Sequence, residues 1–176
     1  MKKFLLGVAL FVATISNAQK GSILLGGNVG FNSEKIGDSR SSNFEFTPKI
    51  GYQFTDHWTA GVEGTVANVE VAGFGTTEQY KIGAFTRYSL PLSDLFAFYT
   101  DLGAGYQSTS TNDAKGMYVS VTPALFINMK KGFGLNFSIG GFNYDNLDGK
   151  NDPRQERVGF NFGRTFNVGI SKNFGL

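Results

Sequence analysis

The sequence predicts an all-β chain that forms an eight-stranded antiparallel up-and-down barrel of the transmembrane kind, behind a cleavable signal peptide. Apolar residues recur at every second position in segments of about ten residues from Ile23 to Phe174, and this period is typical of strands. Charged residues lie on the polar faces in mid-strand, whereas aromatic residues lie at the ends of the apolar faces. That distribution is typical of a barrel with lipid outside and polar groups inside.

The chain begins with the features of an export signal. Lys2 and Lys3 form a basic head, residues 4–15 form a short apolar stretch, and Ser16-Asn17-Ala18 is a small-residue cleavage site. We therefore expect a signal peptide at residues 1–18 and one outer-membrane β-barrel domain at residues 19–176. No later apolar run approaches the roughly 18 to 20 residues that a spanning helix needs.

Charge and composition exclude several classes of function. Removal of residues 1–18 takes away two lysines and no acid, which leaves 14 basic and 14 acidic side chains. A neutral chain lacks the clustered basic surface that binds nucleic acid, so no nucleic-acid partner is expected. The chain has no cysteine, which excludes disulfides, thiolate metal sites and thiol nucleophiles.

Eight segments alternate well enough to be strands, and in chain order they are 23–32, 43–54, 58–68, 79–90, 95–107, 117–128, 133–144 and 158–174. The apolar side of each segment is expected to face lipid. In the same order, the outward residues are Ile23, Leu25, Val29 and Phe31; Phe44, Phe46, Ile50, Tyr52 and Phe54; Trp58, Ala60, Val62 and Val66; Tyr80, Ile82, Ala84, Tyr88 and Leu90; Phe96, Phe98, Leu102, Ala104 and Tyr106; Val119, Val121, Leu125 and Ile127; Phe133, Leu135, Phe137 and Ile139; and Val158, Phe160, Phe162, Phe166, Val168 and Ile170.

The connectors alternate between short and long. Short turns are expected at 55–57, 91–94 and 130–132, and long polar loops are expected at 33–42, 69–78, 108–116 and 145–157. In outer-membrane barrels the short turns face the periplasm and the long loops face outside. Both termini are then periplasmic, and two girdles of aromatic residues flank a mostly aliphatic middle.

The inward positions of the second to fifth segments carry three acids and three bases, which form a balanced charge network in the lumen. These residues are Glu45, Lys49, Glu63, Lys81, Arg87 and Asp101. Counting from the turns places Lys49 directly across from Glu63 and places Arg87 diagonal to Asp101. Because eight strands leave room only for their own side chains, we interpret the network as a plug. The functional alternative is a narrow path for cations or protons.

Two prolines fall inside expected strands. Pro48 and Pro123 each remove one hydrogen-bond donor from a ladder, so a bulge or kink is expected at both positions.

The chain resembles the small outer-membrane β-barrel proteins of Gram-negative bacteria, the opacity-protein and porin-like family. The resemblance rests on the export signal, the eight segments, the unequal connectors and the last strand, Asn167 to Phe174. It implies a location in the cell outer membrane, contact with outer-membrane lipid, and a carboxy-terminal signal, with Gly169 and Phe174, that the barrel-assembly machinery recognises. Lys172, in a usually apolar position, and Gly175-Leu176, after the terminal aromatic, depart from the pattern.

Little in the sequence points to catalysis. The single histidine, His57, lies in an expected turn beside Asp56 with no nucleophile pattern around it. Residues 145–152 resemble a calcium loop, but Tyr144 and Gln155 occupy the positions where carboxylates are required. We therefore expect no enzyme activity, cofactor or metal.

Three functions remain open. The first is a structural or surface-interaction barrel that binds an unknown extracellular ligand through its four long loops. The second is a porin-like channel or transport barrel for a small solute. The third is a secreted barrel of the lipocalin kind, whose apolar faces would turn inward.

Overall fold

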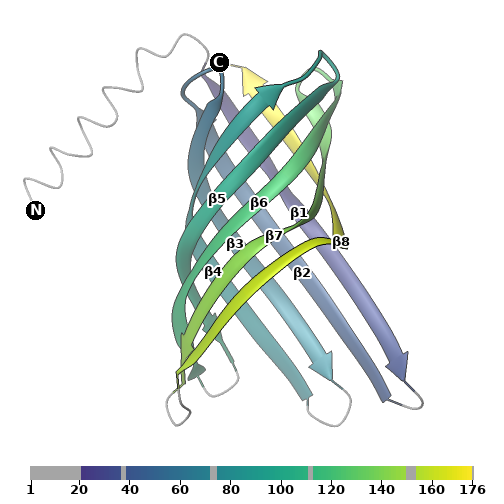
Figure 1. Cartoon of the computed structure of the whole chain (residues 1–176), viewed down its shortest axis with the longest axis vertical. Coiled ribbons are helices and arrows are strands. Elements are labelled where there is room, and N and C mark those ends of the chain that lie inside the picture. The colour runs from purple at the N-terminus through teal and green to yellow at the C-terminus, as the bar shows by residue number, and fades with distance from the viewer. Residues whose placement is uncertain (1–20, 37–38, 72–74, 111–112, 150–153, 176) are drawn as a thin grey trace, which may run out of the picture.

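The computed structural model describes residues 21–36, 39–71, 75–110, 113–149 and 154–175. Consecutive strands pair antiparallel and close into a barrel (Figure 1). The strands are β1 (Ser22–Ile36), β2 (Ser39–Gln53), β3 (Trp58–Val71), β4 (Gly75–Pro91), β5 (Phe96–Thr109), β6 (Lys115–Lys130), β7 (Phe133–Asp148) and β8 (Gln155–Gly175). The predicted all-β, eight-stranded fold is confirmed. The expected signal peptide, residues 1–18, lies outside the described residues.

Within the described ranges, no helix has the length and apolar character needed to cross a membrane.

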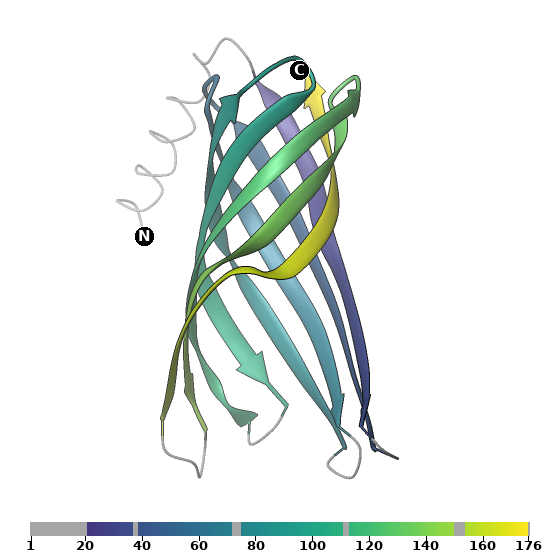
Figure 2. The ribbon, with the colours of Figure 1, turned by 45° about the vertical axis from the view of Figure 1, so that its right-hand side comes forward.

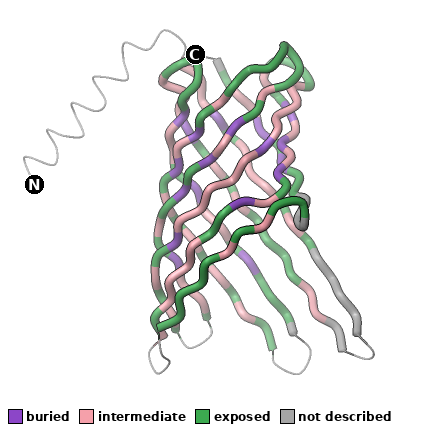
Figure 3. Tube along the Cα trace, viewed as in Figure 1, coloured by how far each residue is buried: buried purple, intermediate pink, exposed green. Residues whose placement is uncertain are grey.

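The apolar face of the sheet points outward. Leu102 and Val62 are 48% and 56% exposed, whereas Glu63 and Asp101 are 8% and 5% exposed. Every predicted outward residue with a described side chain is exposed or half-buried, and buried and accessible positions alternate along the strands (Figure 3). The prediction that the apolar face of the sheet points outward and the charged face inward is therefore confirmed. The inverted arrangement of the lipocalin kind, with apolar faces inward, is wrong.

The strands run further than the sequence pattern predicted at one end of the barrel. The turns 54–57, 92–95 and 131–132 are short, as expected, but the opposite connectors cover only 37–38, 72–74, 110–114 and 149–154. The prediction of long loops at 33–42, 69–78, 108–116 and 145–157 is therefore wrong in extent. Backbone pairing continues there, as in the pair Glu70 and Thr76, although the outward positions are now polar, as at Glu70, Thr76 and Glu78. Alternation marks only the part of a strand that is apolar on one side, so it underestimates strand length.

The two prolines differ in their effect. The register is the same on both sides of Pro48, so of the bulge or kink expected there no bulge is present. The β2–β3 pairing is nevertheless interrupted at Pro48, which still lies opposite Gly27 of β1. At Pro123 the β6–β7 register does shift, with the extra residue on β7. The bulge expected at Pro123 is confirmed.

β8 is sharply bent near its middle. Opposite the single β7 residue Ile139, β8 places four residues, 163–166. Gly140 of β7 and Gly163 of β8 have φ angles of 122° and 77°, in a region that glycine adopts without steric cost. These extra residues form a large bulge, and Figure 2 shows β8, in yellow, curving across the barrel instead of following β1.

The bend ends the pairing between β1 and β8 partway along the two strands. β1 pairs with β8 only from Ser22 to Asn28, whose last partner is Gly169. Beyond that pair the described parts of the two strands diverge toward the loop end (Figures 1 and 2). We call the region between residues 29–36 of β1 and 155–162 of β8, where these two strands do not pair with each other, the seam.

Candidate functional site in the polar lumen

The interior of the barrel has a packed half and a hollow half. Toward the turns, Leu24, Phe85, Tyr99 and Ala124 are each at most 6% exposed and fill the lumen. Toward the loops, a polar cavity of about 830 Å³ occupies the lumen. A group of charged side chains is part of the lining of this cavity.

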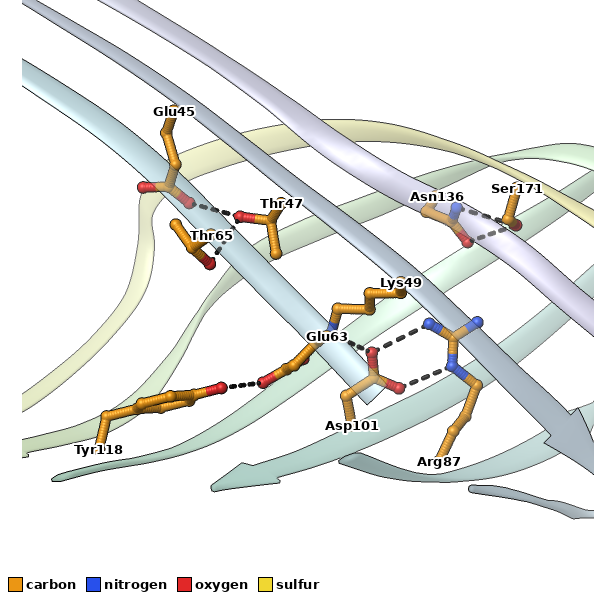
Figure 4. Close-up of polar contacts among 10 residues, drawn as sticks. All are labelled: Glu45, Thr47, Lys49, Glu63, Thr65, Arg87, Asp101, Tyr118, Asn136 and Ser171. Atoms are coloured by element: carbon orange, nitrogen blue, oxygen red, sulfur yellow. Dashed lines mark hydrogen bonds and ion pairs between the residues drawn. The ribbon is translucent and has the colours of Figure 1, made fainter. Parts of the chain in front are cut away.

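Four charged side chains from four neighbouring strands form one connected group, which we call the ion cluster (Lys49, Glu63, Arg87 and Asp101). The Lys49 Nζ atom lies 2.8 Å from Glu63 Oε2 and 2.9 Å from Asp101 Oδ2. Arg87 donates to both oxygens of Asp101, at 2.6 Å from Nε and 2.9 Å from Nη2 (Figure 4). Two acids and two bases balance, so their mutual attraction and hydrogen bonds offset the cost of removing these ions from water.

Aromatic residues surround the ion cluster. The Tyr118 hydroxyl donates to Glu63 Oε1 at 2.9 Å. The guanidinium of Arg87 lies 3.7 Å from the Tyr99 ring centre, and Lys49 Nζ lies 5.0 Å from that of Phe85. Desolvated cations gain stabilisation from the faces of aromatic rings. The ion cluster is thus held by three kinds of contact at once.

Glycine provides the space into which Glu63 extends. A Cβ atom at Gly103 would contact the Glu63 carboxylate and would lie 2.9 Å from Ser120 Oγ. That distance is shorter than side chains tolerate, so Gly103 permits the carboxylate to reach Lys49 and Tyr118.

The structure places the predicted lumen residues as follows. Lys49 lies directly across from Glu63, as predicted. Arg87 lies directly opposite Asp101, so the predicted diagonal is wrong; the turn 92–95 leaves Pro91 facing Ala97, which shifts the register from the one counted.

Two of the six predicted residues lie apart from the ion cluster. Lys81 pairs with Asp145 of β7, 2.8 Å away. β7 is three strands away from β4 around the barrel, so the contact crosses the lumen. Glu45 accepts from the Thr47 hydroxyl at 3.2 Å and is exposed in the cavity.

Several buried polar residues were missed by sequence reasoning, although their inward parity marks them. Gln107 is completely buried and donates to the Met117 carbonyl at 3.0 Å. Asn136 donates to the Ser171 hydroxyl at 3.0 Å on the far wall. Such neutral groups carry no charge pattern, so only their position on the inner face of a strand reveals them.

The two residues of the expected assembly signal lie near the end of β8. Gly169 is buried against Asn28, and Phe174 is 46% exposed opposite Ile23. Their recognition by the assembly machinery stays a prediction.

The expected turn histidine lies at the turn end of the barrel. His57 is exposed, and its Nδ1 lies 2.9 Å from the Ser89 carbonyl oxygen. Within the described ranges, no three or more acidic, histidine or cysteine residues are grouped so as to hold a metal ion. The groups in the lumen can bind polar molecules through hydrogen bonds and ion pairs.

The Tyr118 hydroxyl gives a first prediction. We expect Tyr118→Phe to lower the free energy of unfolding by about 1.5–3 kcal/mol, because Glu63 loses a hydrogen bond to a charged acceptor. Urea unfolding of the refolded barrel measures the change. Tyr80→Phe is the matched control, since the Tyr80 hydroxyl donates to the exposed Glu78 at 2.8 Å and its loss should change stability by at most about 0.5 kcal/mol. Equal effects of the two variants would contradict the role of Tyr118.

Known structures share this architecture. Neisserial surface protein A superimposes with a TM-score of 0.59 at 13% identity, over 88% of this chain and 97% of that one. OprG of Pseudomonas aeruginosa gives a TM-score of 0.46 at 14% identity, over 89% and 93% of the two chains. Ail of Yersinia pestis gives 0.40 at 18% identity, over 88% and 99%.

The first of these comparisons carries the conclusion on fold. The resemblance to small eight-stranded outer-membrane barrels is confirmed at the level of the fold, and identities below 20% extend it no further. No protein-family model and no curated protein sequence matches the chain.

Proposed function

We propose that this protein is a non-enzymatic integral protein of the bacterial outer membrane, with a lumen closed by the ion cluster and with loop-end hairpins that contact other molecules. Outer-membrane lipid and, during biogenesis, the barrel-assembly machinery are its expected partners, together with an unidentified extracellular ligand. The observation that carries the proposal is the inside-out distribution of polarity. Ionic groups are buried near the axis, whereas large apolar side chains cover the outside.

The outer surface has the features of a lipid contact. Many large apolar side chains on the described strands are between 36% and 76% exposed, and soluble proteins rarely expose apolar patches of more than a few hundred Å². Trp58 packs against Tyr88 at the turn end, with ring centres 5.0 Å apart, and Phe31 lies beside Phe44 toward the loop end. Aromatic pairs at two heights are typical of membrane interfaces.

Cell fractionation and gel mobility test the location. The protein should sediment with outer membranes, require detergent for extraction, and migrate differently before and after boiling because a folded barrel resists detergent. Recovery in the periplasm or medium without detergent would contradict the proposal.

The ion cluster supports the closed lumen. Its four side chains are held together by ion pairs inside the barrel, and the buried rings of Phe85 and Tyr99 lie against Lys49 and Arg87. We expect only baseline conductance from the protein in planar bilayers. Lys49→Ala should lower the unfolding midpoint in detergent yet leave conductance near baseline, because Phe85, Arg87 and Tyr99 still fill the packed half. Large, steady conductance from the unmodified protein would overturn the closed lumen.

A transport function is the second candidate, and the cavity of about 830 Å³ is the observation that favours it. A solute that entered this cavity would have to cross the ion cluster to reach the turn end. Liposome swelling distinguishes the two functions: swelling with small sugars or amino acids at a rate above protein-free vesicles indicates transport.

A further inference from the structure

The seam connects the cavity with the side of the barrel. The cavity is lined by Gly30 and Phe31 of β1 and by Gly159 and Asn161 of β8. These are the parts of the two strands that do not pair with each other. The cavity is therefore bounded at this place by the edges of two strands and not by a continuous sheet.

The edge of β1 that does not pair with β8 needs hydrogen-bonding partners in a membrane. An unpaired strand edge presents a row of backbone N–H and C=O groups. In hydrocarbon each unsatisfied group costs several kcal/mol, and open sheet edges facing lipid do not occur. In a membrane, something polar must therefore lie in the seam beside β1.

The outer flanks of the seam are apolar. Val29 and Phe31 on β1 are 57% and 71% exposed, and Phe160 and Phe162 on β8 are 76% and 61% exposed. The seam thus lies in the part of the wall that would meet lipid chains. A polar cavity that opens between apolar flanks suits a molecule with one polar and one apolar end.

The cavity favours a headgroup without net charge. Four carboxylates and four cationic side chains line it, and six asparagines are among its other lining residues. Most of these ionic groups already neutralise one another, as in the pairs Lys81–Asp145 and Lys49–Glu63. Amides both donate and accept hydrogen bonds, so the lining is suited to a hydroxyl-rich, uncharged group.

We propose that the seam and cavity form a binding site for a single-chain amphiphile with an uncharged, hydroxyl-rich headgroup. The headgroup lies in the cavity among the asparagines and extends along the unpaired edge of β1, where its hydroxyl groups meet the backbone N–H and C=O groups. The alkyl chain leaves on the outer side of the seam, past the side chains of Phe31 and Phe160. The proposal rests on the proposed insertion of the barrel in a membrane.

Photocrosslinking in vesicles tests this site. The barrel is reconstituted in phosphatidylcholine vesicles that contain a trace of dodecyl maltoside with a diazirine on its sugar. Mass spectrometry after illumination should locate adducts on inward residues such as Asn143 and Asn161. A second probe with the diazirine at the end of the alkyl chain should label the apolar flanks of the seam. The absence of cysteine leaves no thiol to capture the reagent.

Two glycine positions supply a matched pair of variants. A Cβ at Gly159 would meet nothing closer than the Asn143 carbonyl oxygen at 4.0 Å, so Gly159→Trp fits and fills the mouth of the cavity. Gly64, on the outer face of β3, is similarly open, with its nearest neighbour at 3.7 Å. Headgroup labelling in the cavity should fall at least tenfold in Gly159→Trp and stay unchanged in Gly64→Trp.

Three results would overturn the site. The first is headgroup labelling restricted to lipid-facing residues. The second is equal labelling in Gly159→Trp and Gly64→Trp, and the third is equal labelling by a dodecyl sulfate probe. Loss of labelling on addition of free maltose would show that the cavity binds a soluble sugar, and it would overturn the proposal that the ligand is an amphiphile. Mobility before and after boiling is measured on the same vesicles, so a failure to insert, which contradicts the proposed function, is distinguished from an inserted barrel without the site.

Discussion

Asp101→Asn should lower the free energy of unfolding by about 3–5 kcal/mol, the range observed when one partner of a buried ion pair is removed. Asp101 is 5% exposed and accepts from both Lys49 and Arg87. The neutral amide leaves the ion cluster with an excess positive charge on side chains that are largely buried. Urea unfolding of barrels refolded in phosphatidylcholine vesicles measures the change.

The control for this prediction is the same chemical change at an exposed pair. Glu156 lies 3.1 Å from Arg154 with both side chains more than half exposed, so Glu156→Gln should cost less than about 1 kcal/mol. The double variant Lys49→Met/Asp101→Asn removes one charge of each sign and should recover part of the lost stability, which a double-mutant cycle quantifies. A loss below about 1 kcal/mol in Asp101→Asn would show that the ion cluster does not hold the barrel together.

Leu102→Arg should destabilise the barrel by about 2–4 kcal/mol in a bilayer, because a cation on the lipid face near the membrane middle loses its hydration. Leu102 points outward from the middle of β5 and is 48% exposed. The measurement is the unfolding free energy in vesicles. In a protein surrounded by water the same substitution at an exposed site would be nearly neutral, so the result separates the two environments.

Asn68→Arg is the matched control for Leu102→Arg. Asn68 is exposed on the outer face of β3 and lies opposite Glu78 near the loop end. An arginine there reaches the interface, where the cost falls to about 0–1 kcal/mol. Equal effects of the two variants would contradict the outer-membrane proposal.

The orientation of the sheet and part of the ion cluster could be predicted from the sequence. Side-chain direction alternates strictly along a strand, so one correct assignment, such as Val62 outward, fixes Glu63 inward. The short turn before Trp58 then sets the pairing of Lys49 with Glu63. Local geometry determines both the direction of these side chains and the Lys49–Glu63 pairing, so both could be predicted from one sequence.

Features that depend on distant strands could not be predicted in this way. Lys81 and Asp145 lie 64 residues apart in the chain, and no short turn relates their registers. The expected segment 158–174 contains the bulge at 163–166, which interrupts the alternation without a proline to mark it. Gly140 and Gly163 provide the only local sign, and glycine is too common in this chain to single them out.

The short pairing between β1 and β8 has a consequence for how the ring assembles. Seven residue pairs close it, from Ser22–Gly175 to Asn28–Gly169, whereas β1 and β2 share 15. Since contacts between neighbours in sequence cost less loop-closure entropy than a contact between the chain ends, we expect this pairing to form last in folding. With the fewest residue pairs of any two neighbouring strands in the described part of the chain, it is also where we expect local opening of the native barrel to begin.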